Sequence, residues 1–96
     1  MDDEQLYTMV LEYSGGTYIS QVVERSAPSA VHRWAHLLTD AQLDGWKLAR
    51  EDVLEMSEND EPTPITGCRN VWCLSASARG GLILLNIVAT ISERAV

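Results

Sequence analysis

Two Gly-Gly pairs, each lying between two segments of strand-like sequence, constrain the fold of this chain more than any other feature. The pairs and their flanking segments are, in chain order, Leu6–Tyr13, Gly15-Gly16, Thr17–Arg25, Asn70–Arg79, Gly80-Gly81 and Leu82–Ile91. Two consecutive glycines suit the two-residue turn of a β-hairpin, because both can take a positive φ without a steric penalty. The sequence therefore predicts two antiparallel hairpins.

A turn at each Gly-Gly pair decides which residues lie opposite each other in the hairpin. The predicted pairs are Tyr13 with Tyr18, Leu11 with Ser20, Met9 with Val22, Trp72 with Ala89, Leu74 with Ile87, Ala76 with Leu85, and Ala78 with Ile83. Nearly all of these side chains are apolar, so we expect this side of each hairpin to face the core.

The segment after the first hairpin has the pattern of a helix. Ser26 is a suitable N-cap, and Pro28 falls in the first turn, where its missing N–H costs nothing. Apolar residues recur at helical spacing at Ala27, Ala30, Val31, Trp34 and Leu38. We predict a main helix over 27–38, followed by a short turn that begins with a capping box at Thr39–Gln42 and stops at Gly45.

The stretch between this helix and the second hairpin is harder to assign. Residues 46–56 fit a strand or a second short helix, and a short strand at Val53–Met56 is preferred. Residues 57–66 are acidic and contain two prolines, so we expect an exposed loop there, as well as an acidic tail at 1–5. The predicted architecture is one α+β domain over 1–96, with a four-stranded antiparallel sheet in ββαββ order and one main helix on one face.

The other face of the second hairpin is half apolar, which is more than a solvated face needs. It includes Val71, Cys73, Leu84, Asn86 and Val88, and one helix covers only one side of a sheet. We expect a homodimer interface here, with twofold symmetry as the default. The alternative is that the acidic loop or a terminus folds over this face.

Charge narrows the range of partners. Fourteen acidic residues against seven basic ones give a formal net charge of −7, which disfavours binding to a phosphate backbone and therefore argues against nucleic acid. A basic protein is a suitable partner for an acidic docking segment formed by Glu55, Glu58, Asp60 and Glu61.

No segment of the sequence is suited to the membrane or to export. The longest apolar run, Leu82–Leu85, is far shorter than the roughly 20 residues that span a bilayer, and the first residues are acidic where a secretory signal is basic. Cys68 and Cys73 would point to opposite faces of an extended segment, so free thiols are expected rather than a disulfide. A cytoplasmic protein without a membrane partner is predicted.

Four side chains raise the question of a metal site. His32 and His36 have the i, i+4 spacing of two ligands on one helix face, and Cys68 and Cys73 would complete a zinc ligand set. However, the two thiols diverge on a strand, and Arg33 stands where a metalloprotease motif has Glu. Two surface histidines are the simpler interpretation, and no metal or cofactor is predicted.

Neither a nucleophile with its base nor a phosphate-binding glycine motif occurs in the sequence. The preferred function is a non-catalytic protein-interaction module that associates with itself. The alternative is a small-ligand-binding domain or a minor enzyme, with a pocket between helix and sheet lined by Trp34, Trp46 and Trp72.

Overall fold

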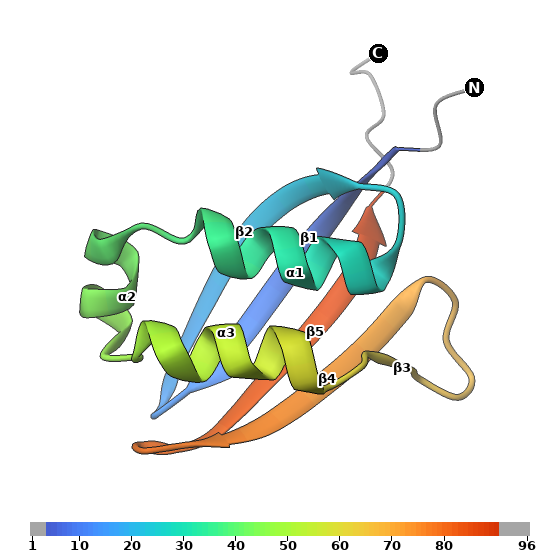
Figure 1. Cartoon of the computed structure of the whole chain (residues 1–96). Coiled ribbons are helices and arrows are strands. Elements are labelled where there is room, and N and C mark those ends of the chain that lie inside the picture. The colour runs from blue at the N-terminus through green and yellow to red at the C-terminus, as the bar shows by residue number, and fades with distance from the viewer. Residues whose placement is uncertain (1–3, 91–96) are drawn as a thin grey trace.

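A single antiparallel sheet, with helices on one of its faces, organises the chain (Figure 1). The computed structural model describes residues 4–90. Its elements are β1 (Gln5–Tyr13), β2 (Gly16–Glu24), α1 (Ala27–Leu37), α2 (Asp40–Trp46), α3 (Arg50–Asn59), β3 (Thr63–Pro64), β4 (Val71–Ala78) and β5 (Gly81–Thr90). The strand order is β2-β1-β5-β4-β3, so the two hairpins join through β1 and β5. Helices α1 and α3 lie side by side across the sheet, and α2 connects them at one end (Figure 1).

The expected four-stranded sheet with one main helix is wrong, because the described residues contain a fifth strand and two further helices. Strand β3 has only two residues, which pair with Trp72 and Cys73 of β4. So short a strand leaves no alternating pattern in the sequence, and it lies within the segment expected to be a loop.

The preferred strand at Val53–Met56 is also wrong, since these residues belong to α3. Val53 and Met56 are both buried. Three residues apart, they share one face of a helix but would point to opposite faces of a strand. Helix α3 extends to Asn59, so Ser57 and Glu58 are helical and the acidic loop is shorter than expected.

Both hairpins form, with a register that differs from the prediction by two residues. The first turn is Ser14-Gly15, both with positive φ (50° and 84°), and the closing pair is Tyr13 with Gly16. These angles are those of a primed hairpin turn. In the second hairpin Ala78 pairs with Gly81, whose φ is 128°.

The remaining glycine of each pair makes room for a tyrosine ring. A Cβ at Gly16 would collide with the phenol of Tyr18, and one at Gly80 would collide with the phenol of Tyr13. One glycine of each pair therefore has a positive φ, and the other lies against a tyrosine ring. Each turn is centred one residue earlier than its Gly-Gly pair.

Alternation along the strands separates a buried side from an open one. Tyr7, Met9 and Leu11 of β1 face the helices, and Ile83, Leu85 and Ile87 of β5 lie beside them. The predicted helix is confirmed as α1, with Ser26 accepting the Ser29 N–H at 3.2 Å. Its Trp34 side chain is buried and its indole N–H donates to Ser20 Oγ at 3.0 Å. The core thus fills the space between the sheet and the helices.

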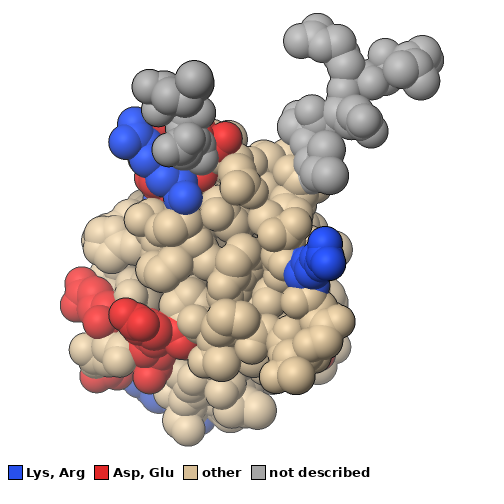
Figure 2. All heavy atoms as spheres, turned by 90° about the vertical axis from the view of Figure 1, so that its right-hand side faces the viewer, with Lys and Arg blue, Asp and Glu red and all other residues tan. Residues whose placement is uncertain are grey.

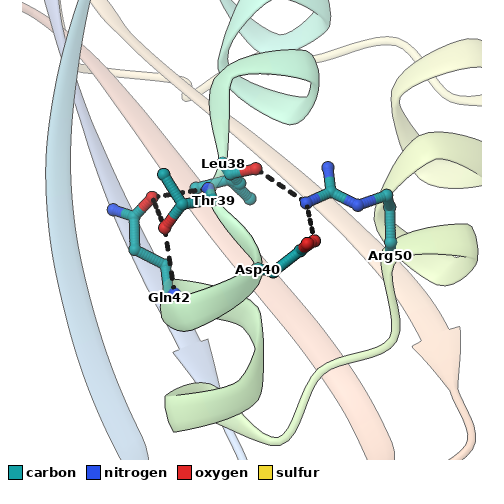
Figure 3. A network of polar contacts seen from close by, with 5 residues as sticks. All are labelled: Leu38, Thr39, Asp40, Gln42 and Arg50. Carbon is teal, nitrogen blue, oxygen red and sulfur yellow. Dashed lines mark hydrogen bonds and ion pairs between the residues drawn. The ribbon is translucent and has the colours of Figure 1, made fainter.

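The helical connection is held by a small polar network (Figure 3). Thr39 and Gln42 form the predicted capping box at the start of α2, with the Gln42 N–H donating to Thr39 Oγ1 at 3.1 Å. Arg50, the first residue of α3, donates to the Leu38 carbonyl at 2.9 Å and to Asp40 at 2.8 Å. The last turn of α2 passes through Gly45 and ends in a left-handed Lys47, so the predicted stop is two residues early.

Candidate functional site

The face of the sheet opposite the helices is the main candidate site, and we call it the open face. Its residues alternate with the buried ones along each strand. They are Leu6, Thr8, Val10, Glu12, Thr17, Ile19, Gln21, Val23, Thr63, Val71, Cys73, Ser75, Ser77, Leu82, Leu84, Asn86, Val88 and Thr90. No described helix covers this side (Figure 1).

The five residues expected at an interface lie together on the open face. Val71 pairs with Val88, Cys73 pairs with Asn86, and Leu84 follows on the same side of β5. Because β5 also pairs with β1, the patch continues through Val10, next to Asn86. The sequence prediction missed the β2 part of this face, although Ile19 and Val23 alternate with Tyr18, Ser20 and Val22, which the hairpin pairing predicts to face the core.

Apolar side chains are unusually exposed on this face. Ile19 is 66% exposed, Leu82 62% and Val23 48%. Val10 and Val88, nearer the middle of the sheet, are half-buried by the side chains around them. The open face is therefore a continuous surface, with valines and uncharged polar side chains together at its centre and large aliphatic groups at its margins.

Charge is nearly absent from the open face. Glu12 is its one charged residue among the described strands, in a chain of which 22% is charged. Figure 2, which looks onto one edge of the sheet, shows acidic side chains at the left, mixed with basic ones near the top, and a basic group at the right. The negative charge of the molecule is thus concentrated away from the open face.

Several polar side chains on the open face already bind one another. Gln21 donates to Thr8 Oγ1 at 3.0 Å, the hydroxyls of Thr8 and Thr90 are hydrogen-bonded, and Thr90 also donates to the Val88 carbonyl at 3.2 Å. When the polar groups of a surface already hydrogen-bond to one another, removing water from that surface carries a smaller free-energy penalty.

The acidic residues expected to dock a basic partner follow one another from α3 into the next loop. Glu55 and Glu58 are exposed on α3, and Asp60 and Glu61 are exposed just after it. At the start of α3, Glu51 forms an exposed ion pair with Arg79 at 2.6 Å, next to the turn of the second hairpin. A docking role for the four expected residues stays a prediction.

The three tryptophans occupy different environments. Trp34 is buried in the core, and Trp46 stacks on Tyr18 with ring centroids 4.9 Å apart. Trp72 lies beside Tyr7, with ring centroids 6.0 Å apart. Each ring therefore has a packing role that does not require a ligand.

The two histidines and the two cysteines are not brought together. His32 and His36 are neighbours on α1, with ring centroids 4.5 Å apart. Cys73 is on the open face, across the sheet from α1, and Cys68 is exposed in the loop before β4; neither thiol is in a disulfide. Within residues 4–90 no three His, Cys, Asp or Glu side chains form a metal-binding group.

One ionisable group on the buried side of the sheet, the phenol of Tyr7, has a pKa that differs from its ordinary value. Burial raises the pKa of Tyr7, and the nearby Glu24 carboxylate adds to the effect. Tyr7 lies against Trp72 in the core, so this shift belongs to packing rather than to the open face.

Comparison with known proteins gives no match, whether to protein-family models, to curated proteins or to solved structures. Over the described residues, no helix combines the length and the apolar character needed to cross a membrane.

Proposed function

We propose that this chain is a protein-interaction module that forms a homodimer by packing two open faces against each other. The observation that carries the proposal is a nearly uncharged face of the sheet, which no element within residues 4–90 covers, in a chain with a net charge of −7. Two packed sheets about 10 Å apart, with strands rotated by about 30°, are a common way to bury such faces.

Charge favours a second copy as the partner. Two chains of the same net charge repel each other, unless they meet where neither carries charge. The open face comes close to this condition, because Glu12 is the one charged residue on it among the described strands and lies beside the turn of the first hairpin. A basic protein would instead be attracted to the acidic side chains around α3.

The size of the face suits a stable dimer. Four long strands spaced by about 4.8 Å, each rising about 3.3 Å per residue over eight to ten residues, give a footprint of roughly 600 Å² before side-chain relief is added. Interfaces of ordinary size bury about 800 Å² on each partner.

The test is sedimentation of the protein and of a Val88→Glu variant. We expect the wild type to sediment as a dimer and the variant as a monomer, with a dissociation constant raised at least about 100-fold, because each copy would then bury a carboxylate at the centre of the interface. Circular dichroism and thermal unfolding verify that the variant remains folded.

Leu37→Glu is the matched control. Leu37 is also an exposed aliphatic residue, at 55%, but it lies on α1, across the sheet from the open face. This variant should remain a dimer. A wild type that is monomeric at about 0.5 mM, or a Val88→Glu variant that stays dimeric, would contradict the proposal.

A further inference from the structure

His32 and His36 form a pair that faces solvent on the outer side of α1. They are one helical turn apart, and both are exposed. Their rings contact each other, and within the described chain no hydrogen bond or ion pair engages either imidazole. Both rings are thus available to an external ligand.

The two rings are close enough for one metal ion to reach a nitrogen of each, with centroids 4.5 Å apart and ring planes inclined at 45°. A metal at about 2.0–2.1 Å from an imidazole nitrogen lies roughly 3.2 Å from the ring centroid. When one nitrogen of each ring binds the metal, a nitrogen–metal–nitrogen angle of about 90° places the centroids about 4.5 Å apart, whereas a tetrahedral angle places them about 5.2 Å apart. The centroids of His32 and His36 are 4.5 Å apart.

The surroundings leave room for the rest of a coordination sphere. The histidines line an open hollow of about 700 Å³ on the protein surface, whose other charged residues are Glu58 of α3 and the ion pair of Arg33 with Glu24. Because no third ligand of the described residues joins the pair, the protein would supply two nitrogens and water would supply the other ligands.

From this geometry we infer that His32 and His36 chelate one divalent late first-row transition ion, with Cu²⁺ bound most tightly. Square-planar coordination by nitrogen is typical of Cu²⁺ and Ni²⁺, and Cu²⁺ leads the general affinity order of divalent first-row ions. Zn²⁺ prefers the wider tetrahedral angle and binds more weakly here. The inference does not rest on dimerisation, because the pair lies on the helix side and not on the open face.

The test is calorimetric titration of untagged protein with Cu²⁺, Ni²⁺ and Zn²⁺ in a Cys68→Ser, Cys73→Ser background, which removes competing thiols. We expect one Cu²⁺ per chain, with weaker binding of the other two ions. His32→Gln or His36→Gln should each reduce the Cu²⁺ affinity at least about tenfold, because one imidazole cannot chelate.

A matched control exchanges two neighbouring residues. The H36L/L37H variant keeps the composition of the chain but places the second imidazole five residues from the first, away from the same helix face. Leu37 is exposed, so the exchange should leave the fold intact. Its Cu²⁺ affinity should fall to that of the single-histidine variants.

A second measurement separates chelation from loss of structure. Bound Cu²⁺ should raise the unfolding temperature of the protein and show two equivalent imidazole nitrogens in its electron paramagnetic resonance spectrum, and H36L/L37H should show neither effect. The Val88→Glu variant should bind Cu²⁺ like the wild type. Equal Cu²⁺ affinity in the protein and in H36L/L37H would overturn the inference.

Discussion

At the scale of single residues, the space around a glycine decides the effect of adding one methyl group. Gly80 faces the phenol of Tyr13, a side chain buried in the core, whereas Gly45 in α2 has no heavy atom within 4 Å of the place where a Cβ would stand. We therefore expect a glycine-to-alanine substitution to have opposite effects on the free energy of unfolding at these two positions.

Gly80→Ala should lower the free energy of unfolding by about 1–3 kcal/mol, because Tyr13 is enclosed and cannot move aside without strain. Gly45→Ala should raise it by about 0.5–1 kcal/mol, since alanine loses less entropy in a helix. Chemical unfolding of both variants measures the difference. Equal effects of the two substitutions would show that the ring of Tyr13 yields freely.

Tyr7 makes the fold sensitive to alkali. Its folded-state pKa is raised above the usual value of about 10, so the unfolded chain loses this proton more readily than the folded one. The resulting stability is complete below pH 10 and is lost as the pH rises through the raised pKa. Tyr7→Phe should remove this part of the pH dependence.

The measurement is urea unfolding of wild type and Tyr7→Phe at several pH values between about 8 and 11. The difference in the free energy of unfolding should be constant below about pH 10, and above it the wild type should lose stability faster than the variant. A difference that does not change with pH would rule out this role for Tyr7.

Residue patterns in the sequence predict burial better than they predict pairing partners. A register shift of two residues returns every side chain to the same face, because side chains alternate with a period of two. Met9 was therefore placed correctly toward the core, although it pairs with Ser20 and not with Val22. In the first hairpin, the register shift arises because the turn is formed by Ser14 and Gly15, both with positive φ. The Gly-Gly pattern in the sequence does not reveal that Ser14 takes this conformation.

At the scale of elements, capping residues define where α2 begins. Thr39 accepts the Gln42 N–H, and Gln42 Oε1 accepts the Thr39 N–H at 2.8 Å (Figure 3). Thr39→Ala should therefore lower the free energy of unfolding by about 1 kcal/mol. Thr39→Ser keeps the hydroxyl and should stay close to the wild type in chemical unfolding; equal losses in the two variants would assign the effect to the methyl group.

Elements with local signals were the predictable ones. Helix α1 has an N-cap serine, an early proline and an apolar stripe, and these coincide with its observed start and buried face. Helix α3 has no side chain that caps its N-terminus, and only Val53 and Met56 of its residues are fully buried. These weak local signals left a second short helix as the alternative to the preferred strand in this stretch. Strand β3 is too short to leave an alternating pattern at all.

At the scale of the whole molecule, the open face could be anticipated only in part. The half-apolar side of the second hairpin was visible in the sequence, but its extent depends on the joining of β1 to β5. Because β2 pairs with β1, that contact also places Ile19 and Val23 of β2 on the open face. The ring geometry of His32 and His36 likewise required coordinates, since spacing alone places two histidines on one turn without fixing the distance between them.

The pairing of β1 with β5 also sets the order of events as the chain is made. Tyr13 and its partner Ile83 are about 70 residues apart, which corresponds to roughly 4–14 s of synthesis at typical ribosomal rates. During this interval the first hairpin and the helices exist without the strand that occupies the centre of the sheet. During synthesis one edge of β1 therefore stays unpaired until β5 emerges, and in this period the apolar residues of β1 are accessible to a chaperone.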